Sequence, residues 1–375
     1  MIPFNRSYTT GKELEYIQEA INRGHTCGNG YYTNKCQEFF QERYGFKKCL
    51  LTTSCTDALE MAAVLIDIQP GDEVIMPSFT FVSTANAFVL RGAKIVFCDS
   101  RADHPGMDED QIEALITPKT KAIVPVHYAG VACDMERIMA LADKYGLFVV
   151  EDAAQAIDSF YKGRPLGGIG HLGCFSFHET KNISSGEGGM LVINDERFAK
   201  RAEIVWEKGT NRQAFFRGEI DKYGWVDIGS SFLPSDMIAA FLFAQLEHLD
   251  EIQAGRLEIW NRYYQILLPV HSASGIRLPF IPDYATNNAH MFYMVFAGAD
   301  NKDEALRKLK NNGIHAVFHY QGLHNSEYMR GLSQGISCPQ AEIYSEMLIR
   351  LPLYKGLDMG QAFCDKICMS LTGIK

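Results

Sequence analysis

Short apolar runs alternate with amphipathic stretches between about residues 50 and 195. The runs are rich in β-branched residues and end in small or polar ones, and we expect strands in KKCLLTT, GDEVIMPS, AKIVFCDS, KAIVPVHYAG and LFVVEDAA. The stretches between them have helical periodicity, as in TDALEMAAVLID, STANAFVLRG and DMERIMALADKYG. Repeated strand–helix–strand units predict an α/β fold in which helices cover both faces of a mostly parallel sheet.

The pattern changes after Asp195. We expect a helix from Phe198 to Lys208, then a polar loop, then one long helix from about Asp236 to Leu267. Further along, the apolar segments HMFYMVFAG and HAVFHY alternate with the amphipathic stretch KDEALRKLKNNG. A chain of 375 residues is long enough for two cores. The sequence therefore predicts a large domain over 1–250 and a smaller C-terminal α/β domain over 251–375.

Composition and charge narrow the class of protein. The net charge is −9 and no Lys/Arg run is present, so we expect no nucleic-acid partner. Ten cysteines occur without a CxxC pair, which argues against a zinc ribbon. The segment MIPFNRSYTT lacks the pattern of a signal peptide, and no apolar run reaches the length of a membrane span. We expect a cytoplasmic protein with free thiols and no membrane partner.

Ligands of a parallel sheet bind beyond the carboxyl ends of its strands. In LLTTSCTDAL a strand ends and a helix starts at once, and Ser54 and Thr56 are suited to cap that helix. The free N–H groups of such a helix start bind phosphate well. An ordinary helix cap explains the same residues without any ligand.

A carboxylate ends the next informative strand. In VVEDAAQAI the apolar run stops at Asp152, which is suited to keep the pyridine nitrogen of a cofactor protonated. A helix-capping aspartate accounts for this position equally well.

Lys181 lies further along, in GCFSFHETKNISSGEGG, among small and polar residues. A partly desolvated lysine forms a Schiff base with an aldehyde, although most lysines are only solvated surface charges. Ser176 and His178 share one face of a strand, but no G-x-S-x-G elbow surrounds the serine, so a hydrolase is a weak alternative.

Other motifs fail their context tests. GIGHLG matches G-x-G-x-x-G but precedes a strand instead of following one, and no P-loop motif occurs. Two pairs have spacings that metal sites use, but no second pair lies nearby, so we expect no metal: His319 with His324, and Cys364 with Cys368.

The order of helix start, strand-end aspartate and later lysine resembles fold type I pyridoxal-phosphate (PLP) enzymes, the aspartate aminotransferase-like fold. The segments PSFTFVSTANAF, PVHYAG, VVEDAAQA, CFSFHETKN and GEGG resemble the DegT/DnrJ/StrS family of sugar aminotransferases. The resemblance covers nearly the whole chain. It implies a mostly parallel sheet, PLP as cofactor and amino transfer to a keto sugar.

The resemblance also implies roles for single residues. Lys181 becomes the Schiff-base lysine and the acid/base that moves the proton. Asp152 pairs with the pyridine nitrogen, Gln155 lies near the ring hydroxyl and Phe81 stacks on the ring. The phosphate is held by Ser54, Cys55, Thr56 and Ser176, and His178 supports the site.

One segment departs from the family pattern. Many relatives carry an Asn in G-Y-N-Y-R that reaches the phosphate of the neighbouring subunit, whereas GSSFL here has Ser231 at the Asn position and Leu233 at the Arg position. A serine still donates one hydrogen bond, but the Arg charge is lost. The resemblance implies a homodimer or higher homo-oligomer.

The implied substrates are L-glutamate as amino donor and a nucleotide-linked keto sugar as acceptor. LLTTSCT, IVPVHYAGVACDM and KGTNR most resemble family members that act on a dTDP-linked keto sugar. Three alternatives stay open: a different nucleotide-linked sugar, a PLP-dependent dehydratase and a non-catalytic PLP-binding regulator. The presence of Lys181, which dehydratase relatives replace with His, argues against the second, and Lys181 with Asp152 argues against the third.

Overall fold

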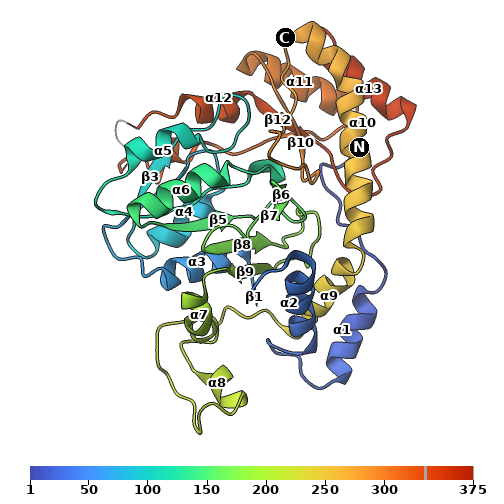
Figure 1. Cartoon of the computed structure of the whole chain (residues 1–375). Coiled ribbons are helices and arrows are strands. Elements are labelled where there is room, and N and C mark those ends of the chain that lie inside the picture. The colour runs from blue at the N-terminus through green and yellow to red at the C-terminus, as the bar shows by residue number, and fades with distance from the viewer. Residues whose placement is uncertain (333–335, 375) are drawn as a thin grey trace.

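The computed structural model describes residues 1–332 and 336–374, and its centre is a seven-stranded sheet (Figure 1). The strand order is β1-β9-β8-β5-β4-β2-β3, and β9 alone runs antiparallel to its neighbours. The predicted α/β class and mostly parallel sheet are confirmed. The strands are β1 (Lys48–Thr52), β2 (Glu73–Pro77), β3 (Lys94–Cys98), β4 (Thr120–Ile123), β5 (Phe148–Asp152), β8 (Leu172–Ser176) and β9 (Gly189–Ile193).

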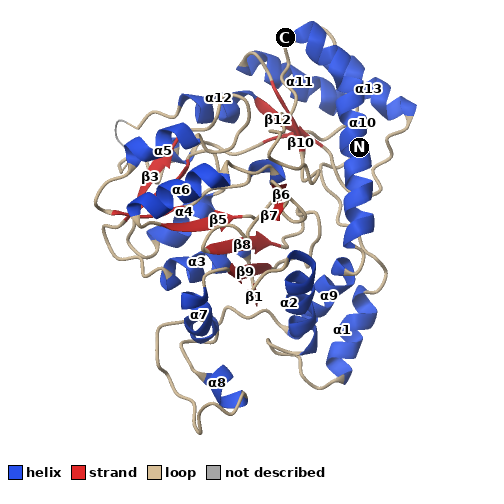
Figure 2. Cartoon of the chain, viewed as in Figure 1, coloured by secondary structure: helices blue, strands red, loops and turns tan. Residues whose placement is uncertain are grey.

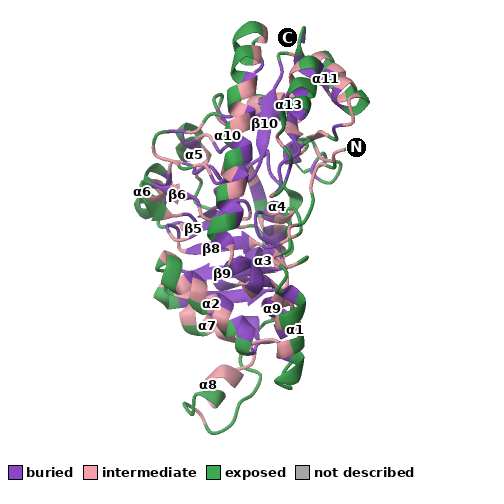
Figure 3. Cartoon of the chain, turned by 90° about the vertical axis from the view of Figure 1, so that its right-hand side faces the viewer, coloured by how far each residue is buried: buried purple, intermediate pink, exposed green. Residues whose placement is uncertain are grey.

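Helices cover both faces of this sheet (Figure 2). Alternate strand residues point to opposite faces, so Leu50 joins one apolar cluster and Leu51 the other. The first cluster contains α3 (Cys55–Leu65), α4 (Val82–Val89) and α7 (Ala199–Trp206). The second contains α2 (Tyr31–Tyr44), α5 (Glu109–Leu115), α6 (Met135–Tyr145) and α9 (Asp236–Leu246). Buried strands between part-exposed helices are visible in Figure 3.

A second, smaller lobe has its own sheet and core. The order is β10-β12-β11, with both neighbours antiparallel to β12. The long helix α10 packs on this sheet from one side together with α11 and α13 (Figure 1). Its elements are α10 (Leu249–Ser274), β10 (Phe292–Val295), α11 (Ala299–Asn311), β11 (Val317–Phe318), α12 (Pro339–Met347), β12 (Leu348–Leu351) and α13 (Gln361–Leu371).

The remaining elements are short or lie at the periphery. Helix α1 (Glu13–Asn22) packs against α9, and α8 (Arg212–Phe216) lies on a loop that projects from the body (Figure 1). A two-stranded ribbon and three 3₁₀ turns complete the chain: β6 (Phe160–Tyr161), β7 (Arg164–Pro165), η1 (Tyr128–Gly130), η2 (Glu196–Phe198) and η3 (Leu323–Asn325).

Two expected elements differ from the prediction. The helix expected from Asp236 to Leu267 is two helices, because α9 ends at Leu246 and α10 starts at Leu249. Helix α10 then continues past Pro269 to Ser274, so the predicted division at residue 250 falls in its first turn. In KAIVPVHYAG the strand ends at Ile123, and Pro125, which has no N–H to donate, precedes a 3₁₀ turn.

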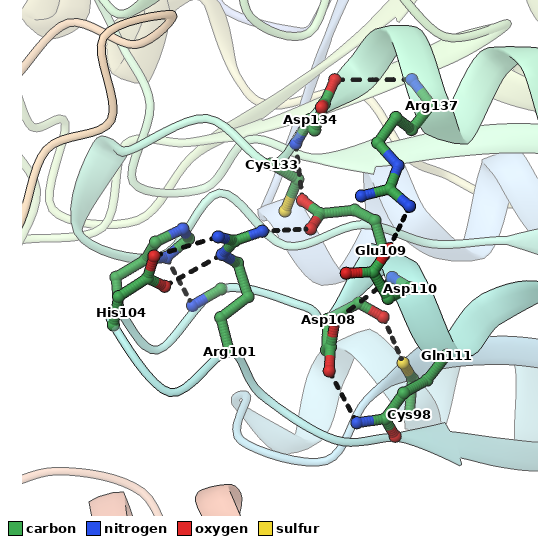
Figure 4. A network of polar contacts seen from close by, with 12 residues as sticks. Cys98, Arg101, His104, Asp108, Glu109, Asp110, Gln111, Cys133, Asp134 and Arg137 are labelled. Atoms are coloured by element: carbon green, nitrogen blue, oxygen red, sulfur yellow. Dashed lines mark hydrogen bonds and ion pairs between the residues drawn. The ribbon is translucent and has the colours of Figure 1, made fainter.

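A polar network joins α5 to α6 (Figure 4). The buried carboxylate of Glu109 accepts hydrogen bonds from the Asp134 backbone N–H at 2.6 Å and from Arg101 Nη1 at 3.1 Å. Asp108 and Asp134 cap the two helices through the N–H groups of Asp110 and Arg137. These contacts fix the two helices relative to each other.

In the described part of the chain, every helix is too short or too polar to cross a bilayer. All ten cysteines are free thiols.

Candidate active site

Strand register brings the predicted residues to one edge of the large sheet. Thr52 at the end of β1 and Ser176 at the end of β8 both pair with Gly189, so they lie in one row. Asp152, at the end of β5, pairs with Cys174 on the same strand as Ser176. Helix α3 starts at Cys55, shortly after Thr52. The N-terminus of this helix, which is suited to bind phosphate, and the Asp152 carboxylate therefore face a common space.

That space is a cavity of about 660 Å³ lined by both lobes. Nine of the ten predicted site residues line it: Ser54, Cys55, Thr56, Phe81, Asp152, Gln155, Ser176, His178 and Lys181. Ser231 does not, since it is exposed and bridges to Glu207 at the base of the projecting loop. Nearly all of the predicted site residues therefore lie in one cavity of a single chain.

The helix start is built for close approach. Ser54 caps α3, its Oγ accepting from the Asp57 N–H at 3.1 Å, and Thr56 Oγ1 donates to Ser83 Oγ at 2.8 Å. A Cβ at residue 189 would overlap the backbone of Ser54 and Cys55, so only glycine lets β9 pass this close. The first N–H groups of a helix lack intrahelical acceptors and favour an anion.

Asp152 is buried, with 5% of its surface exposed, and is held in a fixed orientation. Thr84 Oγ1 donates to its Oδ2 at 2.7 Å and the Ala154 N–H donates to its Oδ1 at 3.1 Å. Thr80 Oγ1 in turn lies 2.8 Å from Thr84 Oγ1. A carboxylate has about four acceptor sites, so Asp152 keeps capacity for a cationic N–H in the cavity.

Gln155 and Phe81 both lie close to Tyr320. Gln155 Oε1 accepts from the Ala129 N–H at 2.6 Å, and its Nε2 donates to Tyr320 OH at 3.1 Å. The Phe81 ring lies 6.1 Å from the Tyr320 ring and is 54% exposed. An open aromatic face beside the cavity suits a flat ligand.

Lys181 lies in the loop that joins β8 to β9. Backbone bonds from Phe177 to Gly188 and from Glu179 to Gly186 close the base of this loop. The next residue, Asn182, donates to Gln253 Oε1 and to the Asn288 carbonyl, both at 2.8 Å. Asn182 thus ties the lysine backbone to the start of α10 and to the segment before β10.

The electrostatics of Lys181 favour its neutral form. Burial lowers the pKa of the Lys181 ammonium below its ordinary value, while Cys55 and Asp152 act to raise it and Arg350 to lower it. A neutral amine is nucleophilic, so this lysine is suited to attack a carbonyl carbon.

His178 sits at the mouth of the cavity. Its Nδ1 lies 3.0 Å from Thr180 Oγ1, and its Nε2 lies 3.8 Å from Glu187 Oε1. Its backbone N–H donates to Ser176 Oγ at 3.4 Å. The side chain is partly exposed and contacts the lysine loop instead of the buried part of the site.

The lining also contains polar residues that the sequence analysis did not predict as site residues, among them Thr84, His290, His319, Tyr320 and Arg350. Burial lowers the pKa of the His290 and His319 imidazoles well below 6.5, so both rings are neutral near pH 7. His319 Nδ1 pairs with Tyr128 OH at 2.7 Å, and His290 Nδ1 with Asn182 Oδ1 at 2.8 Å. His319 Nδ1 thus has a hydrogen-bond partner, and the described residues contain no group of three or more His, Cys, Asp or Glu side chains that could hold a metal ion.

The donor set fits pyridoxal phosphate. An anion site at the start of α3, a buried carboxylate on β5 and an amine of lowered pKa match its phosphate, ring nitrogen and aldehyde. The fold and this site define a PLP-dependent enzyme of the aminotransferase fold.

Comparison with known proteins narrows the class further. The profile of the DegT/DnrJ/EryC1/StrS aminotransferase family matches residues 8–372, so the chain belongs to this family and is a PLP-dependent aminotransferase. The family resemblance seen in the sequence is confirmed.

Solved structures agree over the full chain. TlmJ from Streptoalloteichus hindustanus, an aminotransferase, is 30% identical with a TM-score of 0.88, covering 99% of this chain and 98% of its own. DesV from S. venezuelae, solved with a ketimine intermediate, is 29% identical with a TM-score of 0.89, covering 100% and 99%. The PLP-form of Spr1654 from Streptococcus pneumoniae is 25% identical, with a TM-score of 0.89 and the same coverage.

Proposed function

We propose that this enzyme transfers an amino group from L-glutamate to a nucleotide-linked keto sugar. The specific reaction is the conversion of dTDP-4-keto-6-deoxy-D-glucose to dTDP-4-amino-4,6-dideoxy-D-galactose, a sugar of enterobacterial common antigen. The proposal rests on one observation: Lys181, Asp152 and the start of α3 all line the same cavity. The segments LLTTSCT, IVPVHYAGVACDM and KGTNR support the dTDP-linked substrate by their resemblance.

Each side chain has a defined task in this proposal. When bound, PLP supplies an electron sink that stabilises negative charge at the carbon that loses its proton. Lys181 would hold the cofactor through its amine, and the same amine would serve as the acid/base that moves the substrate proton. Asp152, which Thr84 orients, would accept a hydrogen bond from the ring nitrogen. Phosphate is held by the start of α3 with Ser54, Cys55, Thr56 and Ser176, while Gln155, Phe81 and His178 complete the surroundings.

The acceptor sugar binds on the small-lobe side of the cavity. This side is lined by Phe318, His319, Tyr320 and Leu353, together with Phe4 from the N-terminal segment. Aromatic rings and neutral imidazoles suit a sugar, whose ring has apolar faces and hydroxyl edges.

Homodimerisation belongs to the same proposal. Ser231 lies outside the cavity of its own chain and is exposed, as are most residues of the projecting loop from 216 to 231. That loop carries exposed Phe216, Trp225 and Val226, which are 63%, 82% and 54% exposed. Large exposed apolar side chains gathered on one loop, two of them aromatic, are typical of an interaction surface. We propose that this loop packs on a second copy and brings Ser231 to the partner's phosphate site.

One assay tests the substrate. Purified holoenzyme is incubated with L-glutamate and the 4-keto-6-deoxy sugar linked to dTDP, UDP or GDP, and products are identified by mass spectrometry and NMR. We expect amination of the dTDP sugar, with an axial amine at C4 and no product from Lys181→Ala. Amination of only the UDP or GDP sugar contradicts the dTDP assignment, and glutamate turnover without any aminated sugar contradicts the sugar aminotransferase.

A further inference from the structure

The segment after β11 of the small lobe docks on the large lobe at Ser78, the first residue after β2. Ser78 is fully buried, and its carbonyl oxygen accepts a hydrogen bond from the Leu323 N–H at 2.9 Å. Its Oγ lies 2.5 Å from Nδ1 of His324 and also accepts from the His324 N–H at 3.3 Å. Three polar contacts therefore join one large-lobe residue to the turn η3.

The imidazole of His324 links Ser78 to helix α12. Its Nε2 lies 3.1 Å from Oε1 of Glu342. A carboxylate only accepts hydrogen bonds, so Nε2 carries the proton, and in the neutral ring Nδ1 accepts from the Ser78 hydroxyl. The ring is buried, with 4% of the residue exposed. Both of its nitrogens are therefore paired in one defined tautomer.

The surroundings of the His324 ring allow it little movement. A Cβ at Gly322 would lie 3.0 Å from Cε1 of His324, which is closer than ordinary van der Waals contact. Helix α12 is itself anchored on the large lobe, because the Asp99 carboxylate accepts from the N–H groups of Gln340 and Ala341 at 3.0 and 2.9 Å. The ring is thus enclosed between Ser78 and an anchored helix.

Ser78, His324 and Glu342 have the connectivity of a nucleophilic triad, but they are not arranged to act as one. In a serine-hydrolase triad Nε2 faces the serine and Nδ1 faces the carboxylate, and here the two nitrogens are exchanged. Ser78 also has no exposed surface, so no substrate reaches its hydroxyl. These side chains hold the two lobes together.

Two walls of the cavity are attached to the Ser78–His324 contact. Phe81 follows Ser78 by three residues, and Tyr320 precedes His324 by four. Both rings line the cavity, and their centroids lie 6.1 Å apart. Phe79, which is fully buried, packs against Tyr320 at 5.7 Å between centroids. The Ser78–His324 contact therefore fixes the spacing of Phe81 and Tyr320 across the lobes.

We propose that His324 is a positioning residue whose bond to Ser78 holds Phe81 and Tyr320 at the spacing that catalysis requires. The proposal rests on the proposed function, because it takes Phe81 as the residue that stacks on the cofactor ring. His324 is buried and does not line the cavity, so it acts through these two rings. A misplacement of about 1 Å can reduce a reaction rate by about a hundredfold, even when its cause lies far from the chemistry.

Hydrogen–deuterium exchange of the holoenzyme tests the contact without turnover. In His324→Ala, peptides that cover residues 78–84 and 318–325 should exchange faster by about tenfold, because both segments lose the same anchor. Helices α11 and α13, which pack on the small-lobe core, should exchange as in wild type. His315→Ala removes an exposed histidine from the same lobe and is the matched control, with no expected change.

Visible circular dichroism of the bound cofactor and the kinetics of the glutamate half-reaction report the effect at the site. His324→Ala and Ser78→Ala should each reduce the visible signal and lower the maximal half-reaction rate by about tenfold. The glutamate concentration for half-maximal rate should change by less than about twofold, because the donor contacts are untouched. The double variant should be no worse than either single variant, since both remove one contact.

Amide substitutions separate the two hydrogen bonds of the His324 ring. His324→Asn keeps an acceptor near the position of Nδ1, whereas His324→Gln reaches toward Glu342 instead. We expect His324→Asn to recover most of the rate and of the visible signal, and His324→Gln to recover little. A residue needed only for stability would change the melting temperature of the variants without this selective recovery.

Three results overturn the proposal: wild-type visible signal and half-reaction rate in folded His324→Ala, equal recovery by the two amides, or additive losses in the double variant. Melting temperature and cofactor content establish folding, and the two amide variants supply the comparison if His324→Ala does not fold. Failure of the proposed function looks different, because Phe81→Leu would then keep the wild-type visible signal. A changed signal in Phe81→Leu beside an unchanged one in His324→Ala contradicts only the role of His324.

Discussion

The cavity that contains the amine of Lys181 is also lined by the charged residues Asp152, Glu187 and Arg350. Asp152 stabilises the ammonium form and Arg350 destabilises it, while burial has the largest effect and lowers the pKa. The balance leaves a larger neutral fraction than a solvated lysine has at the same pH.

The pH dependence of cofactor binding follows from this balance. Only the neutral amine attacks the aldehyde, so the rate of PLP association with apoenzyme should rise with pH and level off below pH 10.5, the ordinary lysine value. In Arg350→Gln the lowering influence is lost, so the plateau should move to higher pH. Stopped-flow absorbance measures both curves. A wild-type midpoint at or above 10.5 would contradict the lowered pKa.

Thr84 gives a second residue-scale prediction. Its hydroxyl is the side-chain donor to Asp152, and Thr84→Val removes that donor with little change of shape. A hydrogen bond to a charged group contributes about 1.5–3 kcal/mol, so PLP affinity should fall by about tenfold or more. Thr80→Val is the control with a smaller expected effect, since Thr80 reaches Asp152 only through Thr84. Unchanged PLP affinity in Thr84→Val, measured by fluorescence titration, would show that Asp152 needs no such support.

The sequence predicts those site residues that stand out from their immediate neighbours along the chain. Asp152 follows an apolar strand directly, and Ser54 stands between a strand and a helix, so their positions are visible in short windows. Arg350 and Tyr320 come from the small lobe, more than a hundred residues after Lys181, and enter the cavity only through tertiary packing. The sequence feature that could have indicated Arg350 is its position as a lone charged residue in the apolar segment LIRLPL.

The close packing of β9 against the start of α3 fixes the position of the predicted phosphate site. Gly189 sits in the register that aligns Thr52 with Ser176, against the backbone of Ser54 and Cys55.

Gly189→Ala should therefore push β9 away from α3. Overpacking costs about 1–3 kcal/mol, so the melting temperature should fall and PLP affinity should decrease with it. Gly298→Ala is the matched control, because φ there is −160° and the nearest atom to an added Cβ lies 4.0 Å away. Wild-type PLP affinity in Gly189→Ala would mean that the phosphate does not depend on this approach.

The division of one predicted helix into α9 and α10 shows where element prediction stops. The segment AQLEHLDEIQ contains no Gly or Pro, so its propensity favours an uninterrupted helix. Leu246 and Leu249, on either side of the break, are both 1% exposed and belong to the same large-lobe cluster. Packing against the large lobe sets the break, and local sequence does not encode it.

At the scale of the whole molecule, stability also depends on networks outside the cavity. Glu109 has 2% of its surface exposed and joins α5 to α6 through Asp134 and Arg101 (Figure 4). Glu109→Ala leaves the part-buried Asp134 N–H and Arg101 without this acceptor, so the free energy of unfolding should fall by about 1–3 kcal/mol. Chemical denaturation measures this, with the exposed Glu196→Ala as control. An unchanged denaturation midpoint would contradict a structural role for this network.

Assembly is the second whole-molecule prediction. The molecular mass of the proposed dimer, measured by sedimentation, should be twice the 42.1 kDa mass of the chain. Trp225 is 82% exposed in the single chain, and Trp225→Ser should weaken the dimer because an aromatic residue contributes strongly to an interface. Analytical ultracentrifugation over a concentration series measures both. A monomer at every concentration would contradict the assignment of the projecting loop to an interface.

The most direct test of the central claim is the chemical location of the cofactor. Borohydride reduction of the PLP-loaded enzyme, followed by digestion and mass spectrometry, should place a single pyridoxyl group on Lys181 in the peptide that contains HETKN. A pyridoxyl group on another lysine, or on none, would contradict the account.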